Sequence, residues 1–329
     1  MNRKVTGHLL AVITVAVWGT TFISTKVLLR TFSPIEILVL RFALGYAVLW
    51  LVKPGILRTR DWRQELMYAL AGFTGVGLYY MLENTGLEYT LASNAGVIIA
   101  TAPFFTAVLA HIVGRIAAGK RTSEDTEERS KADAGKRRSA TRTAEERSTT
   151  KVPADAGFRW NFAAGFILAL AGIAIISFNG SKLELNPAGD LMILGAALCW
   201  AFYCIILKKI NTFGHSLILG TRRIFAWGLV SFLPFLPFTG FSVTAEQLLT
   251  PVNIGNFLFL GAGACAACFL MWNYASKIIG PVSANFYIYL TPVVTLVFSA
   301  IVLDEPLTGL LILGTVLTLA GLVVSERGR

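Results

Sequence analysis

Ten long apolar segments constrain this chain more than any other feature of its 329 residues. Each segment can cross a hydrocarbon core of about 30 Å as a helix that rises about 1.5 Å per residue. Helices of a soluble protein would need polar faces, and these segments mostly lack them. The sequence therefore predicts an all-α integral membrane protein with ten transmembrane helices. These predicted helices cover residues 7–28, 34–52, 66–89, 92–113, 160–178, 189–207, 216–237, 253–275, 281–303 and 307–325.

Lys and Arg residues lie almost entirely on one side of the predicted helices. Of the 29 basic residues, 23 fall in segments that share one side with the N-terminus, and two fall in the opposite loops. The other four, Lys26, Arg41, Arg222 and Arg223, lie within predicted spans. Because cytoplasmic loops accumulate Lys and Arg, both termini are predicted to be cytoplasmic, in a multi-pass protein of the cell (inner) membrane. The net charge of +10 follows from this distribution, so we expect the lipid bilayer, and no nucleic acid, as a partner.

The apolar segments form two copies of a five-helix unit. A shift of 189 residues superimposes identical residues of the two copies, and a shift of 182 does the same near the start of each copy. The matched pairs include Gly72 with Gly261, Asn84 with Asn273, Pro103 with Pro292, Trp18 with Trp200, and Arg41 with Arg223. Because each copy has an odd number of spans, the second copy enters the membrane in the opposite direction, which predicts two inverted-topology repeats.

The predicted organisation has three parts. Residues 1–115 hold the first four spans and the start of a cytoplasmic loop, and residues 160–329 hold the second repeat after a fifth span that completes the first half. Residues 116–159 are highly charged and contain almost no large apolar side chain, so they are predicted to be a disordered insertion or a transient charged helix. The alternative for this insertion is a contact with a partner or with lipid headgroups through Lys136-Arg137-Arg138.

A set of short motifs resembles the EamA-type half of the drug/metabolite transporter superfamily. In the first half the motifs are Trp18-Gly19, Arg41-Phe42, the stretch 83–94 and the stretch 101–106; in the second they are Trp200-Ala201, Arg223, the stretch 291–295 and Asp304-Glu305-Pro306. The resemblance implies a secondary transporter that exports a small organic metabolite, amino-acid-like or drug-like, by alternating access. It also implies a cavity between spans 1, 3 and 4 and spans 6, 8 and 9. Where such families have Gly-Glu after the fourth span, this chain has Gly114-Arg115, which leaves Glu305 as the only copy of that carboxylate.

Polar and aromatic side chains at membrane depth are the candidates for lining this cavity. Such faces can bind an amphipathic solute, although small polar residues also help transmembrane helices to pack. The candidates are Trp18, Thr21, Glu83, Asn84, Asn94, Trp200, Tyr203, Trp272, Asn273, Asn285 and Tyr289.

Arg41 and Glu83 both lie roughly 10 Å below the same membrane surface by helical rise. An unpaired charge in hydrocarbon is costly, so each of them needs the other, water or a ligand. Glu83 is therefore predicted either to bind a proton or the substrate, or to form a structural ion pair with Arg41. The repeat equivalent of Glu83 is Trp272, so the second half lacks the matching carboxylate.

Pro103 and Pro292 lie near the middle of the fourth and ninth predicted spans. Proline removes a backbone donor and leaves the carbonyl four residues earlier, at Ile99 and Ile288, without its helical partner. Freed carbonyls are tolerated at this depth only against protein or a watery cavity. We therefore interpret both prolines as hinge candidates, with an ordinary packed kink as the alternative.

Several other functions are disfavoured by the sequence. The Cys265-Ala-Ala-Cys268 spacing has no second Cys or His cluster, so we expect no metal site, and without a glycine-rich phosphate loop we expect neither a nucleotide nor another cofactor. A membrane-embedded lipid-modifying enzyme would need a cluster of catalytic acids or histidines, which the spans lack. A scaffold that presents residues 116–159 to a partner is the remaining alternative, and the sequence leaves open a homodimer.

Single cysteines test the predicted topology. We expect Ala140→Cys to react with a membrane-impermeant maleimide only after permeabilisation, and Glu184→Cys to react in intact cells, because the fifth span separates these positions. The parent chain is the control, since its four cysteines all lie inside predicted spans. Labelling of position 140 in intact cells would contradict the orientation.

Overall fold

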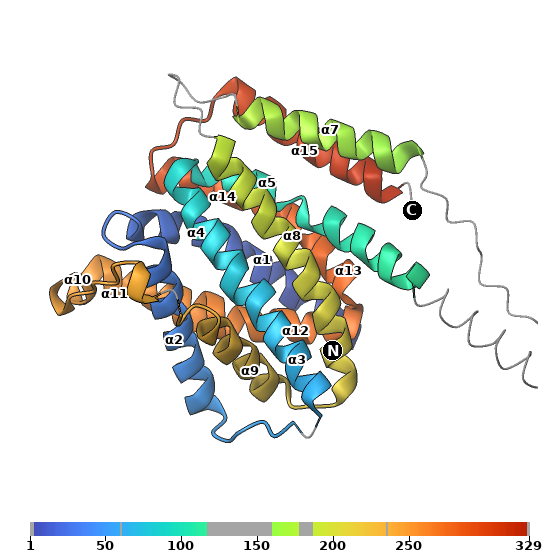
Figure 1. Cartoon of the computed structure of the whole chain (residues 1–329). Coiled ribbons are helices and arrows are strands. Elements are labelled where there is room, and N and C mark those ends of the chain that lie inside the picture. The colour runs from blue at the N-terminus through green and yellow to red at the C-terminus, as the bar shows by residue number, and fades with distance from the viewer. Residues whose placement is uncertain (1–2, 60, 117–159, 178–186, 235, 328–329) are drawn as a thin grey trace, which may run out of the picture.

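The computed structural model describes residues 3–59, 61–116, 160–177, 187–234 and 236–327. All regular elements in these ranges are helices (Figure 1). The predicted insertion lies outside the described residues from position 117 onward. The described chain is therefore all-helical, as the sequence predicts.

The helices follow one another closely along the chain. Their order is α1 (Arg3–Leu28), α2 (Pro34–Val52), α3 (Trp62–Gly72), η1 (Phe73–Leu78), α4 (Tyr79–Tyr89), α5 (Ala92–Ile99), a helix over 102–116, α7 (Trp160–Ser177), α8 (Pro187–Ile210), η2 (Asn211–Phe213), α9 (Leu217–Val230), η3 (Leu236–Phe238), α10 (Ala245–Leu249), α11 (Pro251–Leu258), η4 (Phe259–Ala267), α12 (Cys268–Ile279), α13 (Pro281–Asn285), η5 (Phe286–Leu290), α14 (Thr291–Val302) and α15 (Gly309–Arg327).

In the described part of the chain, six helical segments are long and apolar enough to cross a membrane, as expected of a multi-pass membrane protein. They are Arg3–Leu28, Pro34–Val52, Ala92–Ile116, Pro187–Phe213, Pro251–Ile279 and Pro281–Val302. The other four predicted spans also contain helices, but as described these are shorter or less apolar. The span predicted at 216–237 is too long, because α9 ends at Val230, shortly before Pro234 and Pro237, which have no backbone N–H to continue a helix.

The secondary structure repeats with the same shift of 189 residues that relates the two halves of the sequence. The start of α5 at Ala92 corresponds to the start of α13 at Pro281. After a break in each half, the helix resumes at residue 102 and at Thr291. The π-helix η1 corresponds to residues 262–267, which form the second part of the π-helix η4. The repeat in the sequence is thus accompanied by a repeat in where the helices start and stop.

Helices of the first half pack mainly against helices of the second half. The principal contacts join α4 to α8, α1 to α12 and α14, α2 to η4, and α3 to α9. α7 and α15 pack on each other and lie side by side at one edge of the molecule (Figure 1). The main hydrophobic core therefore lies between the two halves, where aromatic residues such as Trp200, Phe269 and Trp272 are buried.

Gly72 allows α3 and α9 to approach backbone to backbone. A Cβ atom at this position would lie 2.5 Å from the carbonyl oxygen of Ile224 and 2.7 Å from the backbone nitrogen of Gly228. Because backbone atoms cannot move aside as a flexible side chain can, any larger residue must push the two helices apart.

We expect Gly72→Ala to destabilise the protein by about 1–3 kcal/mol, the usual cost of overpacking a filled interface. The measurement is the melting temperature of the purified protein in detergent. Gly255→Ala is the matched control, since a Cβ atom there would meet nothing within 4 Å. Equal melting temperatures for Gly72→Ala and the parent would show that α3 and α9 do not pack this closely.

Candidate functional site

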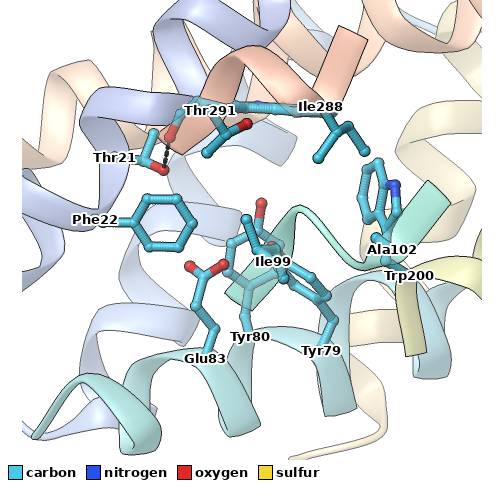
Figure 2. A pocket seen from close by; sticks show the side chains of 11 residues that line it. Thr21, Phe22, Tyr79, Tyr80, Glu83, Ile99, Ala102, Trp200, Ile288 and Thr291 are labelled. Atoms are coloured by element: carbon cyan, nitrogen blue, oxygen red, sulfur yellow. Dashed lines mark hydrogen bonds between the residues drawn. The ribbon is translucent and has the colours of Figure 1, made fainter. Parts of the chain in front are cut away.

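A small cavity lies between the two halves of the molecule (Figure 2). Its volume is about 30 Å³, which is about the share of one water molecule in liquid water. The side chains therefore nearly fill it in this conformation. The lining residues are Trp18, Thr21 and Phe22 from α1, Tyr79, Tyr80 and Glu83 from α4, Ile99 and Ala102 from either side of the break after α5, Trp200 from α8, Ile288 from η5 and Thr291 from α14.

Aromatic rings form much of this central cavity. Trp18 and Trp200 meet edge to face with centroids 5.1 Å apart, and Tyr79 lies 5.5 Å from Trp200. The two indole N–H groups are already used: Trp18 donates to the Ala264 carbonyl at 3.2 Å, and Trp200 donates to Asn285 Oδ1 at 3.1 Å. These hydrogen bonds hold both rings in place. The indoles therefore contribute their apolar ring surfaces to the cavity wall and no free N–H donor.

Glu83 is the only acidic residue among the residues that the structure shows lining the central cavity. It is 2% exposed, and its carboxylate extends from α4 toward the ring of Phe22 (Figure 2). Its Oε1 atom has no hydrogen-bond partner. A buried carboxylate oxygen without a partner is costly, which makes Glu83 a candidate for contact with a ligand or a proton.

Arg41 lies close to the cavity but is held by other groups. Its side chain is 0% exposed, its Nε donates to the sulfur of Cys265 at 3.3 Å, and its guanidinium carbon lies 4.4 Å from the centroid of the Tyr80 ring. The two terminal nitrogens have no hydrogen-bond partner. In the described part of the chain no ion pair within 4 Å joins Arg41 to Glu83, so the predicted direct pair is absent: the guanidinium rests instead on Tyr80 and Cys265.

Four of the residues predicted to line a cavity do so: Trp18, Thr21, Glu83 and Trp200. Four others lie beside it. Trp272 packs on Trp18 at 5.2 Å between centroids, and Asn273 accepts from the Tyr203 hydroxyl at 2.7 Å and donates to Thr221 at 2.8 Å. Besides accepting from Trp200, Asn285 donates to the Pro281 carbonyl at 2.9 Å.

Three predicted cavity residues do not reach the central cavity. Asn84 donates to the Pro34 carbonyl at 3.0 Å and so joins α4 to α2. Asn94 donates to Thr90 one turn earlier at 3.4 Å, and Tyr289 packs on Phe286 at 5.4 Å. Each packs outside the cavity lining, the alternative that the sequence left open, although the side-chain oxygens of Asn84 and Asn94 have no hydrogen-bond partner.

Seven lining residues were not predicted: Phe22, Tyr79, Tyr80, Ile99, Ala102, Ile288 and Thr291. Two signals could have found several of them. Tyr79 and Tyr80 lie one helical turn before Glu83, on the same side of α4. Ile99 and Ile288 lie four residues before Pro103 and Pro292, where the helix is interrupted. Apolar residues at such breaks are therefore candidates for a cavity wall.

Both hinge candidates directly follow a break in a helix. The α-helix stops at Ile99 and resumes at residue 102, just before Pro103. In the second half the 3₁₀-helix η5 separates α13 from α14, whose first turn contains Pro292. Ile99 and Ile288 from these breaks face the central cavity, so a change of angle at either break would change the shape of the cavity.

Polar contacts join several helices at one end of the central cavity. Lys26 on α1 donates to the carbonyls of Leu87 and Thr90 at the end of α4, the latter at 2.7 Å. Glu305 accepts from the backbone N–H groups of Ala92 and Ser93, at 2.8 and 2.9 Å, and so caps the start of α5. A cavity of about 470 Å³ next to Glu305, here called the Glu305 cavity, is also lined by Lys26, Arg30 and Glu88.

The start of α13 differs from the start of α5, which Glu305 caps. The repeat equivalent of Ala92 is Pro281, which starts α13. Proline has no N–H to donate. The start of α13 therefore lacks one of the two donors that Glu305 satisfies at the start of α5.

A second polar cluster lies at the other end of the molecule. Glu65, one residue before the apolar segment 66–89, accepts from Arg223 at 2.7 Å and from Trp227 at 2.5 Å. Burial alone would raise the pKa of Glu65, but the hydrogen bonds from Arg223, Thr59 and Trp227 outweigh it and lower the pKa below its usual value. Arg222 donates to the Lys53 carbonyl at 2.9 Å. Both arginines thus bind protein groups of the segment 53–65.

Apolar helices long enough to cross a membrane, packed around a partly polar central cavity, are the arrangement of a multi-pass membrane transporter. The sequence pattern of the EamA-like transporter family matches residues 5–121 and 187–326. These two segments make up more than half of the chain, and the chain belongs to the EamA-like transporter family. It is a transporter that resides in a lipid bilayer and binds small-molecule substrates.

Several named proteins are similar to this chain over nearly its whole length. An "Uncharacterized transporter" of Archaeoglobus fulgidus is 24% identical over 99% of this chain and 98% of its own. A "Probable amino-acid metabolite efflux pump" of Escherichia coli is 26% identical over 100% and 96%, and a "Probable terminal-alkyne amino-acid exporter" of Streptantibioticus cattleyicolor is 26% identical over 96% and 92%. A solved structure titled "Crystal structure of protein" has a TM-score of 0.60 at 16% identity and covers 98% of each chain, which shows a shared fold.

We expect Pro103→Ala and Pro292→Ala to leave the protein folded but to slow the opening and closing of the central cavity. Each substitution restores a backbone donor and stiffens a break that borders the central cavity. Fluorescence of a probe attached near the Glu305 cavity, measured in stopped flow, would report the rate of this motion. Pro251→Ala, at the start of α11, is the control. Wild-type rates in both variants would assign the breaks to packing alone.

Proposed function

We propose that this protein is a secondary transporter of the cell (inner) membrane that exports a small organic, amino-acid-like metabolite by alternating access. Both termini would be cytoplasmic, and ten helices would form two inverted repeats. The central cavity, to which both halves contribute residues and which contains the buried Glu83, is the observation that carries this proposal. An export route between two related halves needs such a binding site at their interface.

The repeated breaks in the helices support alternating access. Residues 100–101 and η5 occupy equivalent places in the two halves, and both border the central cavity. A bend at one break opens the cavity toward one side, and a bend at the other opens it toward the opposite side, because the two halves are related by inversion. The central cavity is nearly filled in this conformation, as expected of a state that is open to neither side.

The contacts of Lys26 and Glu305 would close the outer side of this route. They join α1 and the segment before α15 to the turn between α4 and α5. Thr90 in the same turn donates to Asp190 on α8 at 2.5 Å. Access from outside therefore requires that these hydrogen bonds break together. The polar cluster of Glu65, Arg223 and Trp227 would lie on the cytoplasmic side.

The names of the relatives support the substrate class. Two of them are named as exporters of amino acids or their metabolites. Glu83 would provide the acid that binds the solute, or a proton that moves in the opposite direction. A lipid-modifying enzyme and a scaffold that presents residues 116–159 are the alternative functions. Deleting residues 120–155 separates the scaffold from the transporter, because only a scaffold would lose its function.

We expect Glu83→Gln to reduce export about tenfold or more, since the cavity would lose the charged partner of a charge-assisted hydrogen bond. Metabolite profiles of the medium, compared between deletion strains that carry the parent or the variant, would identify the exported solute and its rate. Glu246→Gln, on the exposed surface of α10, is the matched control. If Glu83 were structural, Glu83→Gln would lower the melting temperature while export per folded molecule stayed unchanged.

A further inference from the structure

The central cavity contains a negative group and, among the described residues that line it, no positive one. Glu83 contributes the carboxylate, and the other ten lining residues are aromatic, aliphatic or hydroxyl-bearing. The unpartnered Oε1 atom of Glu83 is buried. A carboxylate oxygen accepts hydrogen bonds and cannot donate them when ionised, so the missing partner is a donor, and a cationic donor is favoured most.

The nearest cation does not serve as that donor in this structure. Arg41 uses its Nε on Cys265, its guanidinium rests on the ring of Tyr80, and it is not among the residues that line the cavity. Its terminal nitrogens have no hydrogen-bond partner, so they do not bond to Glu83. The positive charge of Arg41 reduces the cost of burying an ionised carboxylate nearby, while the Oε1 atom of Glu83 stays free.

The rings around Glu83 add a second preference for positive charge. Tyr79 and Tyr80 come from the same helix as Glu83, and Phe22 faces them from α1 (Figure 2). Trp18, also from α1, lines the same cavity. The face of an aromatic ring is electron-rich and attracts a cation that lies within about 6 Å of its centre. At about 30 Å³, the cavity in this conformation has room for a small polar group, such as an ammonium, and not for a whole solute.

We propose that the central cavity selects solutes by a protonated amine, which Glu83 binds through its Oε1 atom while the rings cover the apolar body of the solute. This inference rests on the proposed transport function and specifies the chemistry of its substrate. The same lining disfavours a solute carboxylate. With no cationic side chain in the described lining, and with the Thr21 hydroxyl donated to the Trp18 carbonyl at 2.7 Å, a solute carboxylate finds little to bind it there.

Three probes of similar size separate these charges: 2-phenylethylamine, 2-phenylethanol and 3-phenylpropionate. We expect the amine to raise the melting temperature of the purified full-length protein and to bind about tenfold or more tightly than the alcohol, and the acid not to bind. Isothermal titration in detergent gives the affinities. The alcohol controls for partition of an aromatic body into the micelle.

Variants of Glu83 test whether its carboxylate binds the amine. Glu83→Gln should bind the amine no more tightly than the alcohol, and Glu83→Asp, which keeps the charge but withdraws it by one methylene, should retain a weaker preference for the amine. Glu246→Gln should bind as the parent does. If Glu83→Gln does not fold, the parent and Glu83→Asp still decide the question.

Equal binding of amine and alcohol by the parent, or tighter binding of the acid, would overturn the proposal. So would a folded Glu83→Gln variant that keeps the preference for the amine. Export of a metabolite that carries no amine would also overturn it while leaving the transport function intact. If no solute were exported at all, the transport function itself would fail, whatever the three probes showed.

Discussion

The hydrocarbon of a bilayer offers no hydrogen bonds, and the structure of this protein depends on that constraint. Backbone groups in such a medium must be satisfied inside helices, and a break in a helix is tolerated only next to protein or a cavity. The breaks at residues 100–101 and 286–290 follow this rule, because both border the central cavity. The cavity and the breaks therefore belong together: irregular backbone at that depth requires a place where lipid is absent.

The same constraint sorts the buried polar side chains into two groups. Most of them are satisfied within the protein, as Tyr203, Asn273 and Thr221 are in one chain of hydrogen bonds. These groups fix helices to one another. A second group has buried atoms without a partner, and among the described residues of that group only Glu83 lines the central cavity. In a medium where unpaired charge is expensive, such an atom identifies a site that another molecule completes.

Equivalent residues of the two sequence repeats make different contacts. Arg41 and Arg223 are equivalent in the sequence, yet Arg41 is buried on Tyr80 near the cavity, whereas Arg223 pairs with Glu65. Glu305 caps α5 by accepting from Ala92 and Ser93, whereas α13 starts with Pro281, which has no N–H to donate. Small departures from the repeat thus make one half of the transporter different from the other, although their helices begin and end at matching places.

The sequence by itself determined the membrane class, the helical architecture and the approximate start of nearly every long helix, because apolar length and proline positions act locally. It also singled out Trp18, Glu83 and Trp200, which line the central cavity. Only the tertiary structure decided which polar residues face the cavity. Asn84 and Asn94 look equivalent to Glu83 in the sequence, but they are used in packing. The sequence also could not show that Arg41 and Glu83 form no direct pair. Similar positions along two helices do not fix the directions in which their side chains point. In the structure the Arg41 guanidinium contacts Tyr80 and Cys265.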